Sequence, residues 1–225
     1  MTSKHGSQSD RDANATPPGS EKELRVGITF LGSAASADAL PPADQPEVAI
    51  AGRSNAGKSS VLNRFAGQRQ LARVSKTPGR TQLLNFFAVG ARGRLVDLPG
   101  YGYAKAGKAA QAQWQGHVNR YLSERDTLVG LLLVMDVRHP FSALDEELLE
   151  WAHQSQLPAQ ILLNKADKLK SGARSKALLA ARKRIARQPL CGVQLFSAQS
   201  GLGQGEALSA LARFLDAPSA PQTEN

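Results

Sequence analysis

The sequence predicts an α/β fold in which a mostly parallel sheet is covered by helices on both faces. Short apolar segments alternate along the chain with longer segments of helical periodicity, and this alternation is typical of parallel strands joined by helices. A length of 225 residues suits one domain with extensions. The 41% of hydrophobic and 21% of charged residues indicate a globular protein. We therefore expect a three-layer α/β/α domain.

The expected strands are apolar runs that end at glycines, prolines or polar turns. The apolar run at 129–135 is too short to cross a bilayer and indicates a buried strand. A turn at 90–93 separates two neighbouring strands. In chain order, strands are expected at 24–34, 47–52, 83–89, 93–100, 128–138, 159–167 and 193–198.

The expected helices lie between these strands. Gly67 closes the first helix, and Ser142 is the expected N-cap of the third. In chain order, helices are expected at 58–67, 109–126, 142–154, 171–187 and 205–216. Because helices follow most strands, the loops at the carboxyl ends of the strands should gather at one edge of the sheet, where such folds bind ligands.

One domain is expected over residues 24–217. Residues 1–23 are polar and rich in Ser, Asp, Gly and Pro, and we expect this tail and the short tail at 218–225 to be disordered. The N-terminus lacks the apolar core of a secretory signal. The single cysteine, Cys191, excludes an internal disulfide and fits a reducing compartment. We expect a cytoplasmic monomer.

The charge of the chain is strongly basic and unevenly placed. The formal net charge is +9, and residues 168–205 contain no acidic side chain but eight Lys or Arg residues. A field of one sign favours a polyanionic partner, although a solvated helix face would have the same composition. A membrane surface is disfavoured because the segment has few large apolar residues on one face. We expect neither a membrane nor a DNA partner.

The stretch "GRSNAGKS" indicates a phosphate-binding loop. It matches G-x-x-x-x-G-K-[ST], follows an apolar strand and opens a helix. Its glycines let successive N–H groups converge on an anion, and the helix dipole adds to the attraction. Lys58 should reach the β- and γ-phosphates, and the Ser59 hydroxyl should bind Mg²⁺. The loop residues are Gly52, Arg53, Ser54, Asn55, Ala56, Gly57, Lys58 and Ser59.

Three further strand ends indicate a guanine nucleotide, GTP or GDP. Asp97 can hold Mg²⁺ through water, and the Gly100 N–H can meet the γ-phosphate. The Asp167 carboxylate can accept hydrogen bonds from N1–H and the 2-amino group of guanine, which adenine lacks, so a P-loop ATPase is disfavoured. Asn164 should brace the loop, and the Ala198 N–H could meet guanine O6. The three stretches are Asp97, Leu98, Pro99 and Gly100; Asn164, Lys165, Ala166 and Asp167; and Phe196, Ser197 and Ala198.

Together the stretches "GRSNAGKSS", "SKTPGRTQLLNFF", "DLPGYGYAK", "NKAD" and "FSA" resemble the EngB (YihA/YsxC) family of GTPases from Leu24 to Ala217. The resemblance implies a P-loop G domain like that of small GTPases, acting in assembly of the large ribosomal subunit, with loss of function impairing cell division and septation. It implies Ser59 and Thr81 as Mg²⁺ ligands, whereas the residues alone leave Thr77 as a rival to Thr81. The first switch would supply the nucleotide contacts Gly79, Arg80, Thr81, Gln82 and Leu83.

Catalysis is assigned to Lys58, Asn55 and Gly100. Where many GTPases place a Gln that orients water, this chain has Tyr101, so slow intrinsic hydrolysis is expected. In the class that the sequence resembles, an Asn at the position of Asn55 can help bind K⁺, a cation that would stabilise charge between the phosphates. Asn55 could instead hydrogen-bond its own loop. The remaining sources of rate are an arginine or RNA group from a partner, or the local Arg80.

Two functional hypotheses remain open at this point. The first is a GTPase switch that binds the immature large ribosomal subunit through rRNA and ribosomal proteins, with an indirect effect on division. The second is a GTP-controlled interaction protein that acts on the division apparatus directly. The basic charge favours the first hypothesis, because rRNA is a polyanion.

Overall fold

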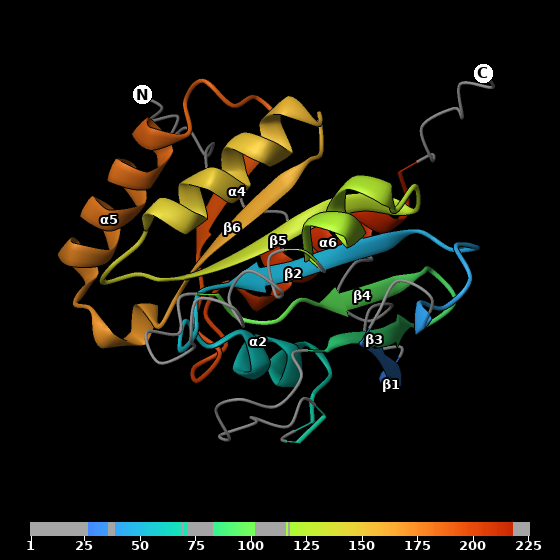
Figure 1. Cartoon of the computed structure of the whole chain (residues 1–225). Coiled ribbons are helices and arrows are strands. Elements are labelled where there is room, and N and C mark those ends of the chain that lie inside the picture. The colour runs from blue at the N-terminus through green and yellow to red at the C-terminus, as the bar shows by residue number, and fades with distance from the viewer. Residues whose placement is uncertain are drawn as a thin grey trace, which may run out of the picture.

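The computed structural model describes residues 27–35, 39–68, 70–71, 83–101, 116 and 118–217. In this part of the chain a seven-stranded sheet carries helices on both faces, which confirms the predicted α/β fold class (Figure 1). The strands are β1 (Ile28–Ala34), β2 (Glu47–Gly52), β3 (Leu84–Val89), β4 (Arg94–Asp97), β5 (Leu128–Asp136), β6 (Ala159–Asn164) and β7 (Cys191–Leu195). The helices are α2 (Lys58–Phe65), α4 (Ala143–Gln154), η2 (Ala166–Lys168), α5 (Ser171–Arg184) and α6 (Gln204–Leu215).

The strands lie in the order β1-β3-β4-β2-β5-β6-β7. β2 pairs in parallel with β4 and β5, and β5, β6 and β7 continue the parallel part. β3 is antiparallel to both β1 and β4, which confirms the expected neighbouring strands on either side of the turn at 90–93. The sheet is therefore parallel at its centre and antiparallel at one edge.

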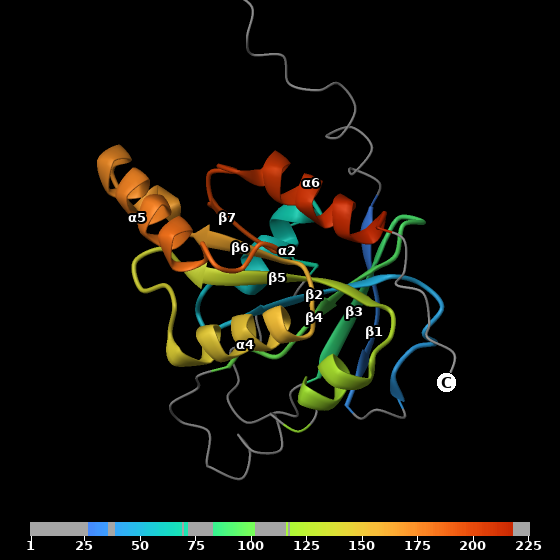
Figure 2. The same ribbon diagram turned by 90° about the horizontal axis from the view of Figure 1, so that it is seen from above.

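Two apolar clusters cover opposite faces of the sheet, because side chains alternate along each strand. Leu131 and Leu133 of β5 join the cluster beneath α4 and the helical residues 118–124. Leu132 and Val134 face the other way and join the cluster beneath α2 and α6. Figure 2 shows these helices on the two sides of the sheet. Because alternate side chains of one strand point to opposite faces, each face packs against its own layer of helices, which gives the three predicted layers.

The path of the chain creates a crevice at the carboxyl end of β2. After β2 the chain places β3 and β4 on one side of it and β5 on the other. Where successive connections leave a parallel sheet in opposite directions, the loops separate and a ligand can bind between them. The loop at 53–57 follows β2 at this point, so the topology alone selects it as the site.

Several predicted boundaries shift in the structure. β7 is Cys191–Leu195 rather than 193–198, because the Ser197 N–H leaves the ladder and donates to the Leu202 carbonyl (3.0 Å). α5 ends at Arg184 rather than at residue 187, because Ile185 turns back onto the core. The capping box of Ser142 and Asp145 confirms the expected N-cap of α4.

Other predictions fall partly outside the described residues. The expected helix at 109–126 is seen at 118–124, and most of its remainder is not described. The tails predicted at 1–23 and 218–225 also lie outside the description. None of the described helices is both long enough and apolar enough to cross a bilayer.

Candidate functional site

The loop between β2 and α2 has a backbone shape that suits an anion. Asn55 and Gly57 both have positive φ, at 67° and 97°, in the left-handed region that lets neighbouring N–H groups form a concave nest. α2 then begins at Lys58 with no side-chain cap and no acidic residue in its first turn. Its first N–H groups and its dipole therefore favour a phosphate at this point.

Close packing explains two glycines of the loop. A Cβ at Gly52 would lie 2.5 Å from the Val134 carbonyl oxygen, and a Cβ at Gly57 would lie 2.4 Å from Nδ2 of Asn164. Both positions exclude any larger residue without movement of the neighbour. The glycines of the G-x-x-x-x-G pattern thus allow the loop to lie directly against β5 and Asn164.

Lys58 and Asp97 form an ion pair at the start of α2. Asp97 ends β4, the parallel neighbour of β2, and its other oxygen accepts a hydrogen bond from Asn85 (3.2 Å). Both side chains of the pair are 10% exposed, so solvent or a ligand can reach them. A phosphate at the helix start would compete with Asp97 for the ammonium group, because both are strong anionic acceptors. Ser59 follows directly and is half-buried.

Asn164 connects the phosphate loop to the loop after β7. Its Nδ2 donates to the Ala56 carbonyl (2.8 Å), and its Oδ1 accepts from the Ala198 N–H (3.2 Å). The side chain is buried, so both bonds form away from water. The structure therefore gives Asn164 the bracing contacts expected from the sequence, and it gives the Ala198 amide a partner within the protein.

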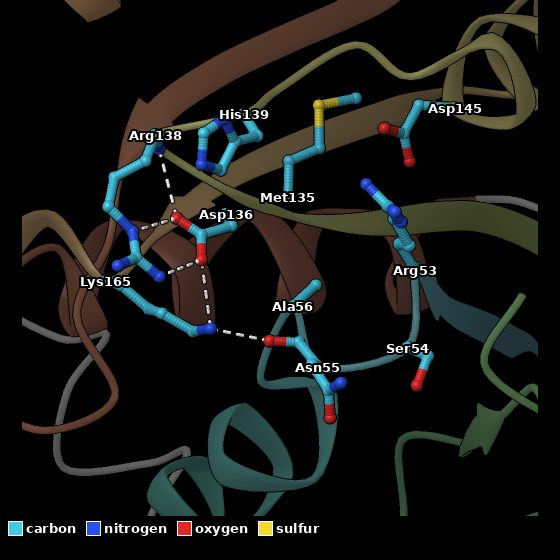
Figure 3. A pocket seen from close by; sticks show the side chains of 10 residues that line it. All are labelled: Arg53, Ser54, Asn55, Ala56, Met135, Asp136, Arg138, His139, Asp145 and Lys165. Carbon is cyan, nitrogen blue, oxygen red and sulfur yellow. Dashed lines mark hydrogen bonds and ion pairs between the residues drawn. The ribbon is translucent and has the colours of Figure 1, made fainter. Parts of the chain in front are cut away.

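Lys165 lies across the phosphate loop. Its ammonium group donates to the Asn55 carbonyl (2.6 Å) and pairs with Asp136 Oδ2 (3.0 Å), as Figure 3 shows. Lys165 itself has a φ of 64°, which places the following turn η2 and Asp167 beside the loop. The aliphatic stem of Lys165 can then lie along a flat base, because the charged end is anchored elsewhere.

Asp167 is held as an ionised acceptor. The Ser197 hydroxyl donates to its Oδ1 (2.6 Å), and Lys168 lies 3.4 Å from its Oδ2. The Ser197 hydrogen bond, and then Lys168, lower the pKa of the Asp167 carboxyl below its ordinary value. A carboxylate with lone pairs remaining can accept two hydrogen bonds from neighbouring N–H groups of one base edge.

The loop after β7 is seated on a buried ring. Phe196 is fully buried and meets Phe65 of α2 edge to face, with ring centroids 5.9 Å apart. Its carbonyl accepts from the Ala166 N–H (3.0 Å), which ties the loop to η2. The two stretches "NKAD" and "FSA", 30 residues apart for Asp167 and Ser197, are thereby brought together as one surface.

The segment after β4 lies against the phosphate loop. The Leu98 N–H donates to the Ile50 carbonyl (3.0 Å), and a Cβ at Gly100 would lie 3.4 Å from the Ser54 Cα. The Ser54 N–H donates to the Tyr101 carbonyl (2.7 Å). Pro99 and Gly100 therefore pass beside the loop, where the sequence analysis expected the γ-phosphate.

The phenol of Tyr101 points into the protein. Its hydroxyl donates to Oδ1 of Asp145 (2.5 Å), the residue of the α4 capping box, and both side chains are buried. Burial, followed by the charge of Asp145, raises the pKa of Tyr101 well above its ordinary value. The ring is thus a neutral anchor for the segment and leaves no hydroxyl to orient a water molecule.

A pocket of ≈ 380 Å³ lies between residues 53–56 of the phosphate loop and the carboxyl end of β5. Asp136, Arg138 and Lys165 form its charged wall, and Arg53 lies opposite them (Figure 3). Hydrogen bonds from Arg138, with Lys165 adding to them, hold the pKa of Asp136 well below its ordinary value. Asp136 was not predicted from the sequence, although its place at the end of a buried strand was a usable signal.

Other site residues were missed because no local pattern marks them. Asn85, which donates to Asp97, lies on an antiparallel strand outside every motif. Asp145 lies in a helix cap and carries no sequence signal of its contact with Tyr101. The expected contacts Gly79, Arg80, Thr81 and Gln82, and the rival ligand Thr77, lie outside the described residues; Leu83 directly precedes β3.

Comparison with known proteins places this geometry among guanine-nucleotide proteins. A family described as "50S ribosome-binding GTPase" matches residues 47–165. The chain is 56% identical over 160 residues to a "Probable GTP-binding protein EngB" of Pseudoalteromonas atlantica, covering 70% of this chain and 77% of that protein. An EngB protein of Coxiella burnetii is 48% identical over 186 residues, covering 82% and 91%.

A solved structure agrees with the fold. The crystal structure of a probable GTP-binding protein engB superposes with a TM-score of 0.61 over 75% of this chain and 98% of that one. The identity there is 19%, so the match bears on the fold alone. It confirms the predicted P-loop G domain.

Proposed function

Because the chain belongs to the EngB family of GTP-binding proteins, we propose that it is a GTPase switch in assembly of the large ribosomal subunit. In this proposal it works in the cytoplasm, and its effect on cell division and septation follows from a shortage of ribosomes. Two observations support it. The description of the matching family names 50S ribosome binding, and the outer face of α5 is basic.

The exposed cations of α5 suit a polyanion such as rRNA. Ala181 is the only buried residue of this helix, and Lys176, Leu179 and Lys183 share the opposite face at helical spacing. Figures 1 and 2 place α5 at the periphery, beside β7. Within residues 168–190, five exposed cations have no acidic partner among the described residues: Lys170, Lys176, Arg182, Lys183 and Arg187. Neutralised phosphates release counterions, so such a face binds RNA in a salt-dependent manner.

The phosphate site has the donors that a Mg²⁺–GTP complex requires. Lys58 would turn from Asp97 to the β- and γ-phosphates, and Ser59 and Asp97 would hold the metal directly or through water. Bound Mg²⁺ would neutralise charge on the phosphate oxygens. The second hydroxyl ligand is proposed to be Thr81. The γ-phosphate would thus order the first switch and the Gly100 segment, and hydrolysis would release them.

Intrinsic hydrolysis is proposed to be slow, on the order of 10⁻⁴ to 10⁻² per second, as in GTPases that lack a supplied arginine. Tyr101 supports this rate, since its hydroxyl is committed to Asp145. We further propose that K⁺ activates the reaction through Asn55. Among the described residues the Asn55 side chain makes no hydrogen bond, and Figure 3 shows it directed away from Arg53 and Asp145. Equal rates in K⁺ and Na⁺ buffers would remove K⁺ activation.

Co-sedimentation with purified large and small subunits tests the ribosomal role. We expect preference for the large subunit in the presence of a non-hydrolysable GTP analogue over GDP, with binding that weakens as salt is raised. The charge reversal Lys176→Glu/Lys183→Glu should reduce binding at least tenfold. Arg120→Glu/Arg213→Glu is the matched control, because it makes the same charge change away from α5. Absence of nucleotide-dependent binding at every salt concentration would favour a direct role at the division apparatus.

A further inference from the structure

Arg64 connects the helix that begins at the phosphate loop to the loop that faces the base. It lies in the last turn of α2, and its Nε donates to the Ala198 carbonyl (2.9 Å) while its Nη2 donates to the Gln199 carbonyl (2.8 Å). The planar guanidinium thus places two donors on two consecutive main-chain acceptors. A fixed fork of this kind sets an orientation as well as a distance.

These two bonds determine how the peptide groups of the loop are turned. A peptide group is planar and trans, so its carbonyl and its N–H point in opposite directions. When Arg64 holds the Ala198 carbonyl, the N–H of the same peptide group, which belongs to Gln199, faces away from α2. The preceding amide, of Ala198, is turned to Asn164 (3.2 Å). The backbone donors of residues 198 and 199 therefore have fixed directions.

Other hydrogen bonds join the loop after β7 to Asp167. The Ser197 hydroxyl donates to Asp167 (2.6 Å) and accepts from the Ser200 N–H (3.1 Å). A Cβ at Gly201, whose φ is 85°, would lie 3.3 Å from the Arg64 guanidinium, so the chain passes close to Arg64 a second time. The loop after β7 is thus hydrogen-bonded to Arg64 of α2 and also to Asn164 and Asp167.

We propose that Arg64 is a positioning residue for guanine selectivity, which holds the backbone N–H of Gln199 where the 6-oxo group of the base arrives, while the Ala198 N–H stays with Asn164. The proposal rests on binding of guanine nucleotides by this chain. Asp167 would recognise the N1–H and 2-amino edge, and the segment held by Arg64 would recognise the oxygen at position 6. Because Lys58 lies in the first turn of the same helix, one rigid element would set both the phosphate and the base contacts.

A purely structural role for Arg64 makes a different prediction. An arginine in the last turn of a helix is favourable for the helix dipole, whatever it contacts. Loss of such a contribution would weaken binding of every nucleotide alike, because it would loosen α2 as a whole. Loss of a positioned donor would weaken only those nucleotides that offer a strong acceptor at position 6. The two roles can therefore be separated by changing the base.

The experiment compares the affinities of GDP, IDP and 6-thio-GDP for the full chain and for Arg64→Ala. IDP keeps the 6-oxo group and lacks the 2-amino group, whereas 6-thio-GDP keeps the N1–H and 2-amino edge and offers a weakly accepting sulfur. Arg64→Ala should lower the affinities of GDP and IDP about tenfold, equivalent to one well-placed hydrogen bond. The affinity of 6-thio-GDP should fall less than about threefold. Arg213→Ala, in the last turn of α6, is the control and should change none of the three.

Four results would overturn the proposal. Equal losses for all three nucleotides would show a general effect of Arg64 on the fold, and unchanged affinities would show no role. Arg64→Lys keeps the charge but not the fork, so it should behave like Arg64→Ala; recovery of the wild-type affinities would contradict positioning by the fork. ADP provides the remaining comparison, since a wild-type chain without preference for GDP over ADP would refute the guanine selectivity that Arg64 is proposed to support.

Discussion

The two ends of β2 each carry a cluster of charged residues, and the two clusters are built in opposite ways. At the amino end Glu47 is fully buried and accepts hydrogen bonds from Arg125 (2.9 and 2.6 Å), Tyr121 (3.0 Å) and Arg94 (3.3 Å). At the carboxyl end Lys58 and Asp97 form a pair that is about as buried as the two arginines but has fewer partners, since among the described residues Asp97 accepts only from Lys58 and Asn85. The first cluster is closed by protein groups, and the second can exchange partners.

The difference shows that ion pairs of similar composition can serve structure or ligand exchange according to how many protein groups hold the carboxylate. Burial, followed by the Glu47 charge, raises the pKa of Tyr121 well above its ordinary value, so this phenol stays neutral and donates. The Glu47 hydrogen bond raises the pKa of Arg125 as well. These hydrogen bonds offset the cost of desolvation. The Arg94 Nε donor, which has no partner among the described residues, is itself buried and so is not offered to a ligand. The pair at the carboxyl end has fewer protein partners, so a phosphate can replace one of them.

Loss of the Glu47 carboxylate should have the largest effect on stability. Glu47→Ala leaves Arg94 and Arg125 without their buried counter-charge, and we expect the free energy of unfolding to fall by about 3–5 kcal/mol. Urea unfolding followed by circular dichroism measures this loss. Glu124→Ala is the control, because Glu124 is 62% exposed and pairs with Arg120 on one helix; it should cost less than about 1 kcal/mol. Equal losses for the two variants would contradict a structural role of the closed cluster.

The contrast between the clusters also marks what the sequence could predict. The phosphate loop, "DLPG" and "NKAD" were found because each is a short pattern beside a strand, and the strand order then brings them together. Glu47 has no such pattern, since it is the first residue of a strand and its partners Arg94 and Arg125 are 47 and 78 residues away.

Contacts between distant segments were likewise beyond sequence reasoning. Tyr101 was recognised as a poor substitute for Gln, but its bond to Asp145, 44 residues on, depends on how α4 packs. Arg64 belongs to no motif, and its partner at Ala198 is 134 residues away. Local patterns identify the groups that touch the ligand, whereas packing decides which groups hold them in place.

At the carboxyl end, Lys58→Ala should affect binding more than stability. Removal of the ammonium group deletes charge-assisted contacts with the β- and γ-phosphates, so GTP affinity should fall by about 100-fold, or about 2.7 kcal/mol. GDP lacks the γ-phosphate, so its affinity should fall less. The free energy of unfolding without nucleotide should fall by only about 1–2 kcal/mol, because the buried Asp97 carboxylate loses one partner but still accepts from Asn85. Titration with a fluorescent nucleotide and urea unfolding give the two values. A stability loss as large as that of Glu47→Ala would erase the distinction between the clusters.

The smallest effect on the free energy of unfolding is expected from substitution of Asp136. This residue ends β5, beside the carboxyl end of β2, and pairs with Arg138 and Lys165. Its pKa is lowered in the folded protein, so its contribution is fully present above the pKa of the unfolded chain, near 3.9, and is lost as pH falls toward the folded value. Asp136→Asn should therefore cost about 1 kcal/mol at pH 7, since part of the site faces solvent. The difference from wild type should stay constant down to about pH 5 and shrink below about pH 4. Urea unfolding at pH 7, 5 and 3.5 measures it, with the exposed Asp126→Asn as control; a difference that grows on acidification would contradict the assignment of Asp136 to the open, ionised cluster.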